Sequence, residues 1–93
     1  MINLAMSEFA LQSLNIAIGS LAFEREVLTL RAESVSAETE DAEQLSEQVL
    51  LVEETLGEFR DVYKSLRGES ITHPPYENIV AEGVRSARAL FER

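Results

Sequence analysis

Apolar residues in the middle of the chain recur at alternating steps of three and four, which is the pattern of a heptad repeat. The repeat comprises Ala42, Leu45, Val49, Val52, Leu56, Phe59, Tyr63 and Leu66. A repeat of this length predicts a long helix, residues 36–67, that packs lengthwise against another helix. Leu56 and Phe59 are predicted core residues because they lie on this repeat without interruption.

The N-terminal third predicts another long helix, residues 4–33, with apolar residues on two sides. One stripe comprises Leu4, Leu11, Leu14, Ile18, Leu21, Leu28 and Ala32. The other comprises Ile2, Met6, Phe9, Ile16, Phe23, Val27 and Leu30, with Ser13 and Ser20 in its gaps. The stripes lie on nearly opposite sides, because residues two apart are separated by about 200° on an α-helix. Such a helix must be covered on both sides, by its two neighbours, another copy of the chain or a different protein.

The join between the two long helices contains neither Gly nor Pro. Ser34 or Ser36 is expected to cap the second helix, and acidic residues follow in its first turns, as the helix dipole favours. The register of the apolar stripe changes across the join, which favours a tight turn and an antiparallel hairpin. A single unbroken helix with a stutter is the alternative.

The second helix is expected to end at Arg67, because Gly68 can adopt the left-handed conformation that terminates helices. A loop, residues 68–73, then leads to a third helix, residues 74–92, with Thr72 or His73 as its cap and Pro74 in its first turn. The predicted fold class is therefore all-α: a single domain consisting of an antiparallel hairpin of two long helices and a shorter C-terminal helix. Whether the third helix packs on its own chain or on a neighbour stays open.

The second stripe of the first helix predicts self-association. A short third helix is not expected to cover the whole stripe, so we expect two copies to pair into a homodimer that resembles a four-helix bundle. The candidate interface residues are Phe9, Ile16, Phe23 and Leu30.

The composition of the chain is strongly acidic, and this limits the kinds of partner that it can bind. The 93 residues include 17 Asp and Glu against 8 Lys and Arg, and residues 33–58 contain no Lys or Arg. We therefore expect no nucleic-acid partner; a solvated acidic face is the favoured interpretation, and a protein partner with a basic surface is the alternative. Residues 9–23 carry no charge but contain too many polar side chains for a membrane span, so we expect no membrane partner. The chain has no Cys and no sign of a signal peptide, which makes the cytoplasm the expected location.

Candidate chemistry is sparse, and we predict no catalytic, cofactor-binding or metal-binding residue. The single histidine, His73, is expected to border the turn before the third helix. The carboxylates Glu53, Glu54, Glu58 and Asp61 resemble in part those that hold magnesium in all-helical nucleotide pyrophosphohydrolases of the MazG type. Glu58 and Asp61 match the Glu-x-x-Asp element of that family, but the Glu-Glu-x-x-Glu element is misspaced and both lie on one helix. Magnesium needs converging oxygens, so a solvated face is expected instead.

The outer side of the second helix is the predicted partner-binding surface. Leu50 and Leu51 lie off the heptad repeat between Glu47 and Glu54; the third helix is expected to cover these leucines, and otherwise they would contact a partner. Gly57 and Gly83 each lower helix stability by about 1 kcal/mol and suggest close helix approach.

The predicted function is a small acidic protein-binding module, such as an adaptor, chaperone or inhibitor. A metal-dependent nucleotide hydrolase of MazG-like type and a structural assembly subunit are the alternatives.

Overall fold

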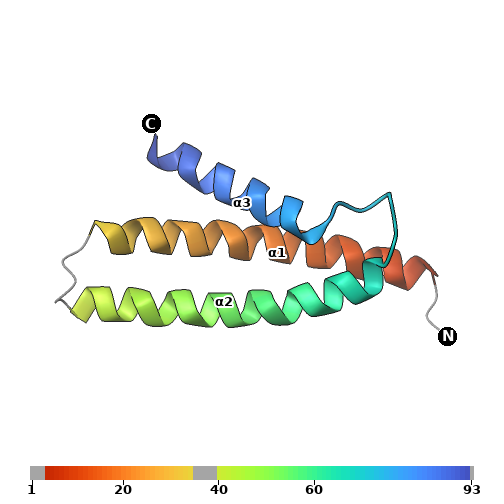
Figure 1. The fold of residues 1–93 in the computed structure, drawn as a ribbon, viewed down its shortest axis with the longest axis horizontal. Helices are drawn as coiled ribbons and strands as arrows, with labels where there is room; N and C mark the ends of the chain where they lie inside the picture. The colour runs from red at the N-terminus through yellow and green to blue at the C-terminus, as the bar shows by residue number, and fades with distance from the viewer. Residues whose placement is uncertain (1–3, 35–39, 93) are drawn as a thin grey trace.

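The computed structural model describes residues 4–34 and 40–92, which are all-helical apart from turns and one loop. Helix α1 spans Leu4–Glu33, α2 spans Glu40–Arg67 and α3 spans Tyr76–Phe91. Figure 1 shows α1 and α2 side by side and antiparallel, while α3 crosses α1 on another side and diverges from it toward the C-terminus. The hairpin is therefore present, and the alternative of one unbroken helix is wrong.

Helix α1 is the central element, because it packs against both α2 and α3. Helices α2 and α3 meet near the loop that joins them. The Cα atoms extend 52 × 27 × 16 Å, so the three helices lie nearly in one layer. None of the described helices is both long enough and apolar enough to cross a membrane.

The core lies mainly between α1 and α2, where the first stripe of α1 meets the heptad repeat of α2. Its buried members are Leu11, Ile18, Leu28, Val52, Leu56, Tyr63 and Ile79. Leu56 is almost fully buried, and Phe59 is partly buried and packs against this cluster. Each stripe of α1 predicted a contact with a neighbouring helix. The first stripe makes this contact with α2, as expected. Ile2 of the second stripe lies outside the described residues.

The ends of α1 and α2 follow from local hydrogen bonding. The Ser34 hydroxyl and amide both donate to the Arg31 carbonyl, at 2.8 and 3.1 Å, so Ser34 closes α1 and the prediction that it caps α2 is wrong. Ser36, the other candidate cap, lies outside the described residues. At the far end of α2, Gly68 has a φ of 55°, and its amide donates to the Lys64 carbonyl at 3.1 Å, as expected for a left-handed helix terminus.

The third helix begins later than the sequence suggested. Its N-cap is Pro75, with φ −59° and ψ 149°, and no side chain caps the first turn, so the predicted caps Thr72 and His73 are wrong. The reason is the paired prolines: a residue that precedes proline is driven out of the helical region, which keeps Pro74 extended. The helix therefore starts after both prolines, at Tyr76.

Candidate functional site

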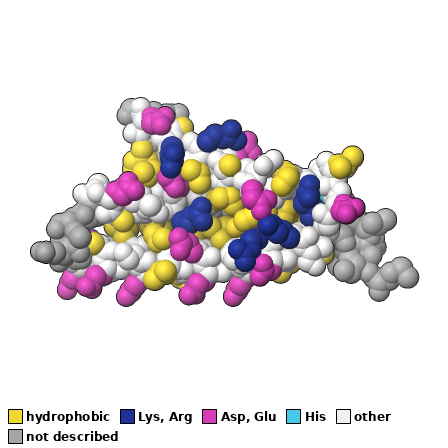
Figure 2. All heavy atoms as spheres, viewed as in Figure 1, with side chains coloured by type: hydrophobic (Ala, Val, Ile, Leu, Met, Phe, Trp, Pro, Cys, Tyr) yellow, Lys and Arg dark blue, Asp and Glu magenta, His cyan; other side chains and the backbone are white. Residues whose placement is uncertain are grey.

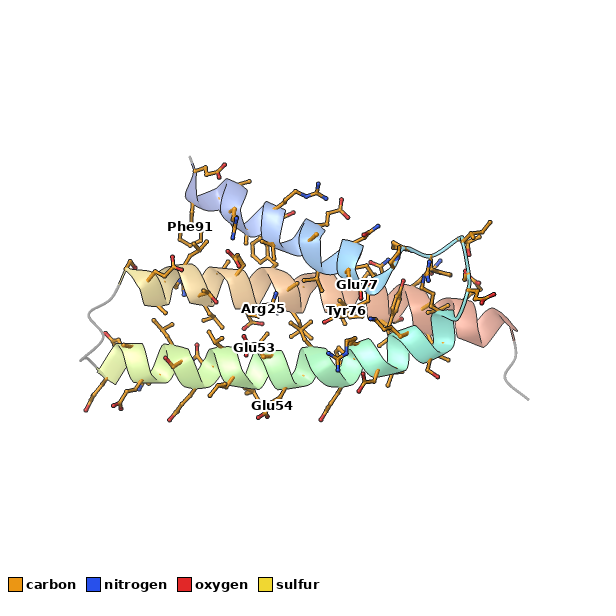
Figure 3. All side chains as sticks on the ribbon, in the orientation of Figure 1. Arg25, Glu53, Glu54, Tyr76, Glu77 and Phe91 are labelled. Carbon is orange, nitrogen blue, oxygen red and sulfur yellow. The ribbon has the colours of Figure 1, made fainter. Side chains whose placement is uncertain are left out.

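The outer face of α2 carries the predicted partner-binding residues, and all four are exposed. Glu47 and Glu54 are solvent-exposed, and the side chains of Leu50 and Leu51 are 59% and 64% exposed. Figure 2 shows acidic side chains along the lower edge of the molecule, on the side of α2 away from α1. In Figure 3, Glu54 projects from this edge, whereas Glu53 lies on the side of α2 toward α1. The structure thus brings acidic and apolar side chains together on one exposed helix face.

The expectation that the third helix covers Leu50 and Leu51 is wrong. Helix α3 packs against α1, and it approaches α2 near the joining loop, where Lys64 Nζ donates to Glu77 Oε1 at 2.6 Å. The leucines lie more than three turns before that contact in α2, and α3 does not pack over them. Both therefore remain available to a partner.

Leu50 and Leu51 lie on different flanks of the acidic face, because successive helix residues differ by about 100°. Leu50 borders a groove of about 360 Å³ between α1 and α2, whose lining residues are Thr29, Ala32, Ser46, Val49 and Leu50. Leu51 lies on the other flank, which α2 shares with half-exposed Val62, three turns further along. A partner that covers the acidic face would meet apolar side chains on both sides.

The second stripe of α1 is only partly covered. Phe23 and Leu30 are half-buried, whereas Phe9 and Ile16 are 73% and 71% exposed. Helix α3 lies beside Phe23 where it crosses α1 at Gly19 and Ala22; a Cβ atom on Gly83 would lie 2.7 Å from the Gly19 carbonyl oxygen. The four candidate interface residues therefore divide into two that are half-buried and two that face solvent.

The loop between α2 and α3 is fixed by three polar contacts. The Tyr63 hydroxyl donates to the Pro74 carbonyl at 2.6 Å, and Arg67 Nε donates to the His73 carbonyl at 2.8 Å. The buried His73 ring places Nε2 2.7 Å from Glu8 Oε2 of α1. Burial raises the pKa of the Tyr63 phenol, against a smaller opposite effect of the Arg67 charge. This arrangement anchors the start of α3 to both long helices.

Sequence reasoning missed the contact between His73 and Glu8. The two residues lie 65 positions apart, and nothing local to either of them indicates the other. A histidine paired with a carboxylate is a common element of catalytic sites, but catalysis also requires a group that this pair would serve. Here the pair joins the loop to α1.

The carboxylates that resemble the MazG-type ligands do not form a metal centre with one another. Within residues 4–34 and 40–92, no group of three or more Asp, Glu or His side chains is close enough to hold a metal ion. The arrangement of Glu53 and Glu54 explains this, because these neighbours point to different sides of α2 in Figure 3. Asp61 instead accepts a hydrogen bond from Arg60 Nε at 3.1 Å.

The ionic contacts of α3 are at the surface. The Lys64 ammonium group, which also lies 5.6 Å from the centre of the Tyr76 ring, lowers the pKa of the Glu77 carboxyl by hydrogen bonding to it. Arg88 Nε donates to Glu26 Oε1 of α1 at 3.0 Å. The Lys64–Glu77 pair is exposed on both sides and contributes little to stability, whereas the Glu26 side chain that Arg88 contacts is only 13% exposed.

Comparison of the chain with protein-family models, with curated proteins and with solved structures gives no match.

Proposed function

We propose that this chain is a small helical protein-binding module that acts through the outer face of α2. The observation that carries the proposal is the exposure of Leu50 and Leu51 beside Glu47 and Glu54 while α3 is docked elsewhere. Large exposed apolar side chains on both flanks of an acidic helix face are typical of surfaces that contact another protein. An adaptor, a chaperone and an inhibitor all fit this description.

The chemistry of this face favours a particular kind of partner. Acidic side chains attract a basic surface over a distance and speed its approach, in a manner that salt weakens. The exposed leucines would add contacts that salt does not affect. An amphipathic helix with apolar residues flanked by Lys and Arg offers both features, and it would lie along α2.

The proposal is tested with two substitutions that separate the charge from the apolar contact. A pull-down with the intact chain, read by mass spectrometry, supplies the partner, and stopped-flow or surface plasmon resonance measurements then give its binding rates. We expect Glu47→Lys to slow association and reduce its dependence on salt. We expect Leu51→Asp to speed dissociation and weaken affinity about tenfold or more, as for a central interface residue.

Two matched controls make the same chemical changes outside the proposed surface. Ile71→Asp and Glu69→Lys both alter exposed side chains of the loop between α2 and α3, and we expect neither to change binding. Circular dichroism verifies that each variant is folded. If Glu47→Lys and Leu51→Asp bind as the parent does, α2 presents only a solubilising face, and the binding site must be sought on α3 around Arg85 and Arg88.

The proposed module is also a homodimer and is located in the cytoplasm. A homodimer is supported by the exposure of Phe9 and Ile16, and a cytoplasmic location rests on the absence of Cys from the sequence. The alternatives are tested directly: a nucleotide turnover assay with magnesium tests the hydrolase, and growth beyond a dimer with rising concentration tests the assembly subunit.

A further inference from the structure

The exposed part of the second stripe on α1 alternates between large and small side chains. Phe9 and Ile16 are the large members, and Ser13 and Ser20 are the small ones; all four are exposed. Their spacing of four, three and four residues keeps them on one side of the helix. Read in the opposite direction, the order becomes small, large, small, large. A second copy of this stripe, running antiparallel, would therefore place a large side chain opposite each serine.

A groove lies where one of these serines meets α3. It has a volume of about 410 Å³ and opens to solvent between α1 and α3. Its lining residues are Asn15, Ile16, Gly19, Ser20, Phe23, Ile79, Glu82, Gly83 and Ser86. The glycines leave space at the helix crossing, and Phe23 and Ile79 make part of the lining apolar. An aromatic side chain that approached Ser20 from outside would enter this groove.

We propose that the occupant is a second copy of this chain, whose α1 packs antiparallel on this stripe. Phe9 of each copy lies opposite Ser20 of the other and enters its groove, while Ile16 lies opposite Ser13. The contact is isologous, because each pairing occurs twice about a two-fold axis that passes midway between residues 14 and 15. Large side chains packed over small ones are the arrangement that lets two helices interdigitate closely.

Charge also favours this face for self-association. The chain has a net charge of −9, so two copies repel one another at most approaches. The outer face of α2 would bring acidic side chains against acidic side chains. Residues 9–23 of α1 contain no charged residue, and this segment includes the four side chains that pair in the proposed contact. The uncharged stripe is thus where an acidic chain meets its own copy with least repulsion.

The size of the contact predicts how tight the dimer is. With the two-fold axis at this position, the helices overlap along roughly 33 Å, and a contact strip about 10 Å wide covers on the order of 330 Å² per copy. That is well below the roughly 800 Å² per partner of a standard stable interface. The dimer is therefore weak and reversible, with a dissociation constant in the micromolar range or above.

The absence of Cys allows a direct test of the register. In the proposed dimer the two copies of Ser13 are separated by about 4.5 Å along the helix axis, and the two copies of Ser20 by about 16 Å. Under a mild thiol oxidant, Ser13→Cys is expected to form a disulfide-linked dimer, while Ser20→Cys is not. Ser65→Cys, which makes the same small change at an exposed position of α2, is the control and should stay monomeric.

The outcomes that overturn the proposal are specific. Equal linking of Ser13→Cys and Ser20→Cys indicates a parallel pair, since in that arrangement each position lies beside its own copy. Linking of Ser65→Cys as readily as Ser13→Cys indicates another interface or random collision. Sedimentation that shows a monomer for the parent chain up to near-millimolar concentration excludes the dimer altogether.

A charge substitution supplies the second measurement. Ile16→Glu is expected to abolish dimerisation while leaving the melting temperature of the dilute chain unchanged, because the Ile16 side chain is exposed in the monomer. A dimer that persists in Ile16→Glu contradicts the proposal. This inference rests on the dimer named in the proposed function. Loss of the dimer and loss of partner binding can be told apart, because Ile16→Glu leaves Leu51 and the outer face of α2 intact.

Discussion

Gly83 is the residue on which the docking of α3 depends most directly, and replacing it with Ala tests the described crossing. A Cβ atom at this position would lie 2.7 Å from the Gly19 carbonyl oxygen, 2.9 Å from Ala22 Cβ and 3.1 Å from the Phe23 amide nitrogen. Two of these atoms belong to the backbone of α1, which also packs against α2 and cannot easily withdraw. Helix α3 must therefore move outward, which loosens the packing of Ile79 and Ala87.

The magnitude follows from two opposing effects. Overpacking of this kind costs about 1–3 kcal/mol. Ala stabilises a helix interior by about 1 kcal/mol relative to Gly, and this gain offsets part of the cost. Gly83→Ala is therefore expected to lower the free energy of unfolding by up to about 2 kcal/mol.

Gly57→Ala is the matched control, because a Cβ atom at Gly57 meets nothing within 4 Å. It should raise the free energy of unfolding by about 0.5–1 kcal/mol. The helix-propensity gain is the same in both variants, so the difference between them isolates the steric cost at the crossing, about 1–3 kcal/mol. Gly19→Ala gives a third comparison: its Cβ atom would lie 3.7 Å from Ile79 Cγ2, an ordinary contact, so we expect it to be tolerated.

Urea denaturation followed by circular dichroism at low chain concentration measures all three variants. In thermal melting of the same variants, a change of 1 kcal/mol in the free energy of unfolding shifts the melting temperature by roughly 4–8 °C for a domain of this size, which is easily resolved. A smaller denaturant m-value for Gly83→Ala would indicate that α3 has detached, since m scales with the surface exposed on unfolding. If Gly83→Ala stabilises the chain as Gly57→Ala does, the close approach of α3 to α1 does not exist in solution.

Two further predictions concern the core and the loop. Leu56→Ala should lower the free energy of unfolding by about 2–5 kcal/mol, whereas Leu51→Ala, on the exposed face of the same helix, should change it by less than about 0.5 kcal/mol; equal melting temperatures would place both side chains in water. Burial raises the pKa of the Tyr63 phenol above its unfolded value near 10, so folding favours the protonated phenol, and its contribution is full below about pH 10 and lost as pH rises through the folded pKa. Tyr63→Phe should lower stability by about 0.5–1.5 kcal/mol at neutral pH and weaken the alkaline dependence seen in pH-dependent melting; an unchanged alkaline dependence would contradict this assignment.

The sequence predicted the helices, and that α1 must be covered on two sides, because these depend on periodicity. The heptad repeat of α2 and the first stripe of α1 required a helix pair, and the second stripe required a further neighbour. Gly68 was recognised as the end of α2 from its conformational freedom alone. The late start of α3 also follows from a local rule, since Pro75 disfavours a helical conformation at Pro74; the capping pattern, which predicts an earlier start, is the weaker of the two signals.

The choice of neighbour for α3 was beyond such patterns. Gly57 and Gly83 look alike in sequence, yet Gly83 alone of the two meets another helix closely. The exposure of Leu50 and Leu51 follows from the same choice, because α3 would have covered α2 had it packed there. That choice depends on how the side of α3 that contains Gly83 and Ala87 fits the Gly19 and Ala22 side of α1, a three-dimensional match that no periodicity records.

The central position of α1 has a consequence for the order in which the molecule folds and opens. The hairpin of α1 and α2 joins segments that follow one another in the chain, whereas the contacts of α3 with α1 join segments that the whole of α2 separates in sequence, and such longer closures are slower. We expect the hairpin to form first and α3 to dock last. In native-state hydrogen exchange, the amides of α3 should then exchange through a local opening that leaves the hairpin protected. Each opening would uncover the part of α1 around Gly19 and Ala22 and so enlarge, for a moment, the apolar surface that α1 offers to other molecules.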